Sequence, residues 1–161
     1  MNKKTKLNKA FFKKHEACID GYEWTLSRPD NTVEGTIKEL IDIERIDWAN
    51  WTIARCLNKK QKIQYAVFAA KQVLDIFEKK YPDDNRPREA IEAAEKCIEH
   101  NTKKNRAAAA ASYAASSASD ASDAAAYASY AASSASYASS ASSAKKKMQL
   151  KILDYGLELL K

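Results

Sequence analysis

The sequence is poor in the two residues that shape turns, because glycine and proline account for only three residues each in a chain of 161. Average proteins contain roughly one Gly or Pro in every eight residues. This scarcity excludes a Gly-rich phosphate-binding loop, a β-sandwich with many turns and a Pro-rich linker. Alanine, the strongest helix former, takes much of the missing share. The composition therefore predicts an all-α fold, and the length fits a single domain over residues 1–161.

Cysteine and long apolar runs are also scarce. The three cysteines, Cys18, Cys56 and Cys97, are odd in number and far apart, which is typical of reduced, mostly buried thiols in a cytosolic protein. No apolar stretch follows the N-terminal lysines as it would in a signal peptide. The longest Ala/Ser stretch is too polar to span a membrane. We therefore expect a cytoplasmic protein without a membrane partner.

The charge balance is mildly basic, with a net charge of +6 at pH 7. The surplus lies at the two ends of the chain, in the N-terminal lysines and in residues 145–147. A surplus of this size permits an anionic partner but does not require one. These lysines are therefore interpreted as solvated tails, and nucleic acid is not the favoured partner.

Apolar spacing predicts amphipathic helices over residues 1–101. One helix is expected over residues 6–26, with an apolar face that comprises Leu7, Phe11, Cys18, Tyr22 and Leu26. After a turn at residues 27–31, capping patterns predict helix starts at Asn31, Asp47 and Asn58. The last of these helices extends to Tyr81.

Residues 82–87 form the clearest break in the chain, since they begin and end with proline. Pro87 is predicted at the first position of the next helix, where its missing N–H costs nothing. That helix carries the apolar residues Ala90, Ile91, Ala94, Cys97 and Ile98. A final amphipathic helix is predicted over residues 145–161, with Met148, Ile152, Tyr155 and Leu159 in line.

Residues 102–144 form an Ala/Ser-rich helical repeat, and from residue 107 onward it contains only Ala, Ser, Tyr and Asp. Alanines recur at alternating spacings of four and three between Ala107 and Ala135, which is a heptad seam. Because Ala lets helix axes approach closely, the seam predicts a long helix or a helical hairpin packed through it, within one chain or in a homodimer. The opposite side carries four tyrosines, Tyr113, Tyr127, Tyr130 and Tyr137.

Three segments precede this repeat in a specific order: residues 18–24 (CIDGYEW), 47–55 (DWANWTIAR) and 84–94 (DNRPREAIEAA). Together with the repeat they resemble the Ala-rich "putative immunity protein" family of bacteriophages and bacterial mobile elements. The resemblance covers nearly the whole chain. It implies a small, non-enzymatic binding protein in the cytoplasm of the bacterial host, which neutralises a toxin or a host defence factor. The Ser and Tyr content between the alanines departs from the pattern expected of the family.

Three groups of residues are candidates for binding a partner or ligand. Trp48 and Trp51, with Arg55, form either a recognition patch or the core of a capped helix. Arg86 and Arg88 lie at a predicted helix start, which favours anions. The alternative is that they form ion pairs with Asp83, Asp84 or Glu89. The four tyrosines of the repeat either bind a partner or pack against the N-terminal helices.

No catalytic signature is present, since the sequence lacks GxSxG, HExxH and Walker motifs. The two histidines, His15 and His100, do not have the spacing of metal ligands. We therefore expect no enzymatic activity, no cofactor and no metal. Three hypotheses stay open: a protein that neutralises a toxin or a host or competitor defence protein, a sponge that sequesters a small anionic nucleotide signal, and an Ala-rich structural or assembly protein.

Overall fold

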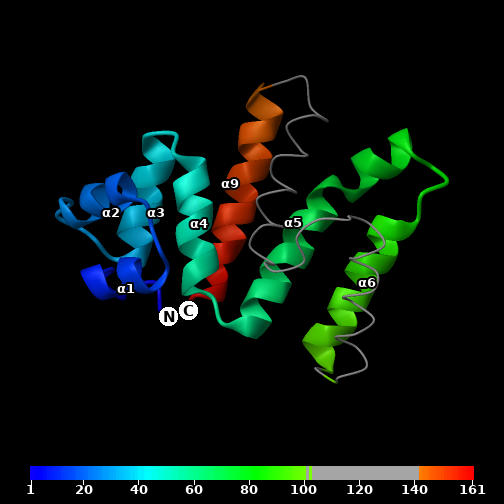
Figure 1. Cartoon of the computed structure of the whole chain (residues 1–161). Coiled ribbons are helices and arrows are strands. Elements are labelled where there is room, and N and C mark those ends of the chain that lie inside the picture. Colours follow the sequence, from blue (N-terminus) through cyan, green and yellow to red (C-terminus); the bar gives the residue numbers. More distant parts are fainter. Residues whose placement is uncertain (101, 103–141) are drawn as a thin grey trace. The chain divides into compact units, whose positions relative to one another are not determined.

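All regular structure in the described part of the chain is helical (Figure 1). The computed structural model describes residues 1–100, 102 and 142–161. For these residues the predicted all-α fold is confirmed. The Ala seam and the four tyrosines of the repeat lie outside them. The helices are α1 (Lys9–Lys14), α2 (Ile19–Leu26), α3 (Val33–Asp42), α4 (Ile46–Cys56), α5 (Lys59–Lys80), α6 (Arg86–Glu99) and α9 (Ser142–Leu159).

The chain divides into two compact units. Unit 1 comprises Met1–Asn58 and Leu153–Lys161, and therefore contains α1 to α4 and the end of α9. Unit 2 comprises Lys59–Ile152 and contains α5, α6 and the beginning of α9. In α9, which begins slightly before the predicted helix, Ile152 and Leu153 are buried, and Leu160, directly after the helix, is buried as well.

Unit 1 has a core in which α3 packs against α4. The side chains of Val33, Ile37 and Leu40 recur at helical spacing along α3 and are excluded from solvent. Ala49 and Ile53 of α4 are likewise fully buried. Burial of a Val, Leu or Ile side chain contributes about 1.5–3 kcal/mol relative to exposure. The amphipathic helix predicted after residue 31 is therefore confirmed, and its apolar face packs against α4.

The first seven residues are bound to the start of α3. The Val33 N–H donates to the Thr5 carbonyl and the Glu34 N–H to the Lys3 carbonyl, each at 2.9 Å. Both donors belong to the first turn of the helix, where no intrahelical acceptor exists. Leu7 is fully buried and its N–H donates to the Asn31 carbonyl at 2.8 Å. The prediction that a helix begins at residue 6 is therefore wrong.

The helix predicted over residues 6–26 is also interrupted between α1 and α2. Glu16 adopts a left-handed backbone conformation with φ of 52°. The Ala17 N–H donates to the Phe12 carbonyl at 3.1 Å, and the Glu16 N–H donates to the Lys13 carbonyl at 3.4 Å. This pair of hydrogen bonds is a Schellman motif, which ends a helix and usually contains Gly at the left-handed position. Because this position holds glutamate instead of glycine, the sequence gives no indication that the helix ends here.

Glu16→Gly is expected to raise the free energy of unfolding by about 1 kcal/mol. The left-handed conformation costs a residue with a Cβ atom about 1–2 kcal/mol, part of which glycine returns through its greater freedom in the unfolded chain. Urea denaturation followed by circular dichroism measures the change. Glu16→Ala is the matched control, since it removes the same side chain but keeps Cβ. Equal effects of the two substitutions would contradict the backbone explanation.

Two helix caps lie close to the predicted positions but on other residues. The N-cap of α3 is Thr32, whose hydroxyl accepts a hydrogen bond from the Gly35 N–H at 3.0 Å, and is not Asn31. The N-cap of α4 is Arg45, so that Asp47 lies in the first helical turn instead of capping it. A carboxylate in the first turn still interacts favourably with the helix dipole. The predicted starts of these two helices are therefore wrong by one and two residues, because several adjacent polar residues could serve as the cap.

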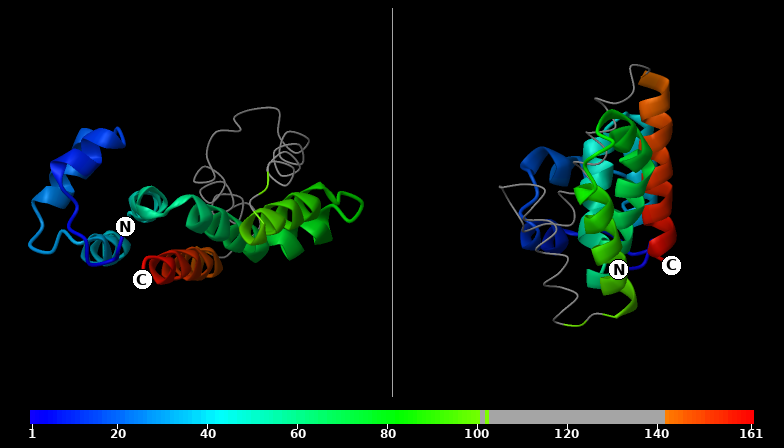
Figure 2. Two further views of the ribbon diagram at one scale, coloured as in Figure 1. Left: turned by 90° about the horizontal axis from the view of Figure 1, so that it is seen from below. Right: turned by 90° about the vertical axis from the view of Figure 1, so that its right-hand side faces the viewer.

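Unit 2 contains a helical hairpin in which α5 and α6 lie side by side (Figures 1 and 2). Val67 and Leu74 of α5 pack with Ile91 of α6, and the partly buried residues around them are Ile63, Ala70, Ala94 and Ile98. The helix predicted from residue 59 and the break at residues 82–87 are confirmed in outline. Pro87 occupies the second position of α6, because the helix begins at Arg86.

Candidate partner-binding sites

Two tryptophans and two arginines of unit 1 form a stacked group, which we call the Arg–Trp cluster: Arg28, Trp24, Trp48 and Arg45. The indole rings of Trp24 and Trp48 meet edge to face with centroids 6.4 Å apart. The guanidinium carbon of Arg45 lies 3.6 Å from the Trp48 ring centroid, and that of Arg28 lies 4.9 Å from the Trp24 centroid. All four side chains are half-buried. The cluster therefore joins α2 to α4 while part of each side chain stays accessible.

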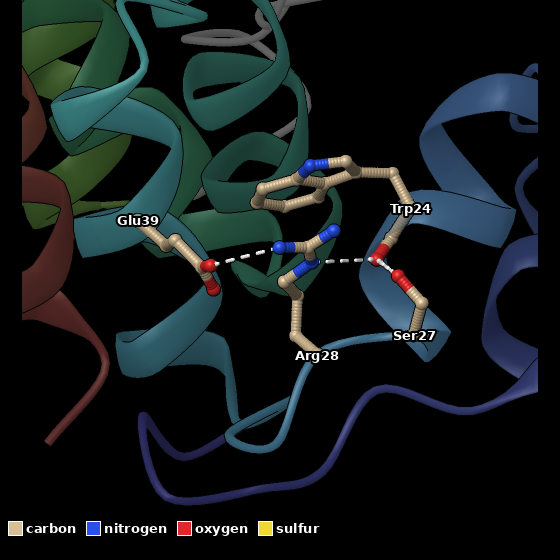
Figure 3. Close-up of polar contacts among 4 residues, drawn as sticks. All are labelled: Trp24, Ser27, Arg28 and Glu39. Atoms are coloured by element: carbon tan, nitrogen blue, oxygen red, sulfur yellow. Dashed lines mark hydrogen bonds and ion pairs between the residues drawn. The ribbon is translucent and has the colours of Figure 1, made fainter.

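Arg28 is held in place by two further contacts (Figure 3). Its Nη1 donates to the Glu39 carboxylate at 3.3 Å, and its Nε donates to the Trp24 carbonyl at 3.4 Å. The Ser27 hydroxyl donates to the same carbonyl at 2.8 Å. This carbonyl lies at the end of α2, where the helix supplies too few donors. Arg28 thus caps the C-terminal end of α2, and its guanidinium group stays against the indole of Trp24.

The other end of the cluster is fixed in a similar way. Arg45 donates to both carboxylate oxygens of Asp47, at 3.3 and 3.2 Å. Burial raises the pKa of Asp47, but the hydrogen bonds from Arg45 and the Trp48 backbone outweigh it and hold the pKa below its usual value. Gly21 of α2 lies beside the indole, and a Cβ atom there would be in ordinary contact with the Trp48 ring, at 3.8 Å, but would lie only 3.2 Å from the Cys18 sulfur. The tightest neighbour of this position is therefore Cys18 and not the indole.

Trp51 and Arg55, which were predicted together with Trp48, belong to a second aromatic group. The Arg55 guanidinium carbon lies 5.6 Å from the Trp51 ring centroid. The ring of Phe11 in α1 meets Trp51 edge to face at 6.3 Å and also packs on His15 at 4.8 Å. Trp48 and Trp51 therefore pack with different helices, α2 and α1 respectively. Sequence reasoning identified both tryptophans but missed Trp24, although an arginine follows it at helical spacing.

Arg86 and Arg88 lie in unit 2, and each donates two hydrogen bonds to one carboxylate. Arg86 binds Asp84 through Nε at 2.8 Å and Nη2 at 2.7 Å. Arg88 binds Glu78 of α5 at the same two distances. Ion pairing, the alternative to an anion site, is confirmed for Arg86 with Asp84, whereas the partner of Arg88 was not anticipated. Since each guanidinium group already holds a carboxylate, the arrangement argues against a phosphate site here.

A comparison with protein families matches residues 54–161 to the family described as "Imm-5 like putative immunity protein". The chain belongs to this family. The matched range contains all of the 84–94 segment and the last two residues of the 47–55 segment, whereas the 18–24 segment lies outside it. The predicted family is thus confirmed over a shorter stretch than expected. Comparisons with curated proteins and with solved structures give no match.

Membership in the immunity protein family implies that the chain binds a cognate toxin and neutralises it, and such proteins are typically inhibitors without catalytic activity. Burial raises the pKa of the Cys56 thiol to about 12, which keeps it protonated at neutral pH and makes it a poor nucleophile. Cys97 is also buried, whereas Cys18 is exposed.

The described residues of this immunity protein family member contain neither a candidate metal site nor a candidate membrane span. No group of three or more His, Cys, Asp or Glu side chains in that part of the chain is arranged to hold a metal ion. None of its described helices combines the length and apolarity needed to cross a membrane. Among the described residues, the Arg–Trp cluster and the Trp51 group are the candidate sites for a partner.

Proposed function

We propose that this chain is a non-enzymatic immunity protein that neutralises one cognate toxin by forming a stoichiometric complex with it. The family match over residues 54–161 carries the proposal. An origin in a bacteriophage or mobile element is part of the same proposal, and it rests on the order of the three segments ahead of the Ala-rich repeat. A toxin fits a binding protein better than a small anionic nucleotide does, because Arg86 and Arg88 are neutralised by carboxylates.

The Arg–Trp cluster supports a protein partner. Tryptophan and arginine are enriched among the residues that carry most of the binding energy at protein interfaces. Here the arginines are already stacked on the indoles and hydrogen-bonded to Glu39 and Asp47. Side chains ordered in this way lose little conformational entropy on binding. We therefore assign Trp48 to the recognition surface, while Trp51 and Arg55 stay candidates on the neighbouring group. Tyr113, Tyr127, Tyr130 and Tyr137 stay a prediction outside the described residues.

A stoichiometric titration tests this function. The chain is first co-expressed in bacteria with a panel of toxin domains, and rescue of growth identifies the cognate toxin. The activity of that purified toxin is then measured against increasing amounts of the purified chain. We expect inhibition to be complete at an equimolar ratio, as binding requires. Complete inactivation by a small fraction of an equivalent would contradict the non-enzymatic mechanism, and rescue of no toxin would contradict the function itself.

A further inference from the structure

The turn between α5 and α6 is hollowed. An open depression of about 630 Å³ is formed there by residues 81–86 together with Glu89 of α6. Tyr81 lies at its edge with 47% of its surface exposed. Its ring packs on Phe77 of α5 at a centroid distance of 4.9 Å. A tyrosine braced in this manner offers a large, amphipathic contact area at a low entropic cost.

The depression is negatively charged although the chain as a whole is positive. Its lining contains three carboxylates, from Asp83, Asp84 and Glu89, against the single guanidinium group of Arg86. Asp84 binds that guanidinium group with both oxygens, and the hydrogen bonds from Arg86 lower the pKa of Asp84. The exposed carboxylates of Asp83 and Glu89 are therefore left in excess at the surface.

The shape of this turn is fixed by hydrogen bonds. The Asp84 N–H donates to the Tyr81 carbonyl at 3.2 Å, and the Arg86 N–H donates to the Asp84 carboxylate at 3.2 Å. Within the first turn of α6, the pair between Arg88 and Glu78 ties the start of the helix to α5. A partner that binds here does not have to order the turn first, which preserves binding free energy.

We infer that this depression docks a lysine- or arginine-bearing loop of the cognate toxin, with Tyr81 as the anchor and with Asp83 and Glu89 as the paired charges. The inference rests on the proposed function and adds to it the surface used and the charge of the partner. Charge complementarity favours this occupant, because the carboxylates of Asp83, Asp84 and Glu89 outnumber the single guanidinium group of Arg86 in the lining of the depression. The turn lies within residues 54–161, the range that matches the family.

The test measures the affinity of the full chain for the toxin identified by growth rescue, using calorimetry at low salt and at about 0.15 M salt. Tyr81→Ala and Asp83→Lys are each expected to weaken binding about tenfold or more. Asp83→Lys is also expected to reduce the salt dependence of the affinity. Glu99→Lys is the matched control, since it reverses an exposed charge at the other end of α6 and should change affinity less than about twofold. Thermal melts establish that every variant is folded.

The outcomes separate the inference from the function on which it rests. Wild-type binding that neither Tyr81→Ala nor Asp83→Lys weakens overturns the docking surface and leaves the proposed function intact. A wild-type chain that binds no toxin of the panel overturns both. Self-association of the chain that Tyr81→Ala abolishes, without any change in toxin affinity, would assign the depression to a second copy and would also overturn the inference.

Discussion

Trp48→Ala is expected to lower the free energy of unfolding by about 3 kcal/mol, at the lower end of the range for aromatic truncations because the ring is half-buried. The substitution removes the edge-to-face contact with Trp24 and the stack of Arg45 at once. It also leaves a gap beside Gly21, which has no side chain to fill it. Urea denaturation followed by far-ultraviolet circular dichroism measures the loss without depending on tryptophan fluorescence.

Trp48→Phe tests whether Trp48 contacts the toxin or only stabilises the fold. Phenylalanine keeps a ring between Trp24 and Arg45, so we expect a loss of only about 1 kcal/mol and a folded protein. If Trp48 contacts the toxin, Trp48→Phe weakens the complex about tenfold or more, because the indole area and its N–H are lost from the interface. An affinity equal to that of the wild type would contradict a role in recognition. Trp48 would then be a structural residue that holds Arg45 in place.

The helical hairpin of unit 2 was predictable because its signals are local. Apolar residues recur at helical spacing along α5, and the two prolines of residues 82–87 mark the turn that follows. The pair between Arg88 and Glu78 was not predictable in the same way, since it depends on how the two helices are aligned. The exposure of Tyr81 likewise depends on where α5 ends, because the spacing alone places this residue on the apolar face.

Unit 1 was harder to predict because its decisive contacts connect residues far apart in sequence. Apolar spacing continues from Phe11 to Tyr22 across the break at Glu16, so that periodicity alone predicts one helix. The Arg–Trp cluster combines residues of α2, of α4 and of the turns before α3 and α4. Trp48 was identified from its own helix, but its partner Trp24 could be recognised only once α2 was placed beside α4.

Leu7→Ala is expected to lower the free energy of unfolding by about 3 kcal/mol, within the range measured for buried leucines. Leu7 precedes α1 and is fully buried. Its N–H donates to the Asn31 carbonyl at 2.8 Å, while its own carbonyl accepts from the Asn31 side chain at 3.2 Å. The backbone is thus held at this point and cannot move to fill the cavity that the shorter side chain leaves. Urea denaturation measures the effect.

Leu26→Ala is the matched control, because Leu26 carries the same side chain at the other end of the predicted 6–26 helix but is only half-buried. We expect it to cost about half as much, and equal losses would contradict the arrangement of the N-terminal segment. Hydrogen exchange adds an independent measurement. The amides of Val33 and Glu34 donate to carbonyls of residues 5 and 3, so Leu7→Ala should speed their exchange by loosening that segment. Leu26→Ala leaves the segment in place, and these two amides should then keep most of their protection.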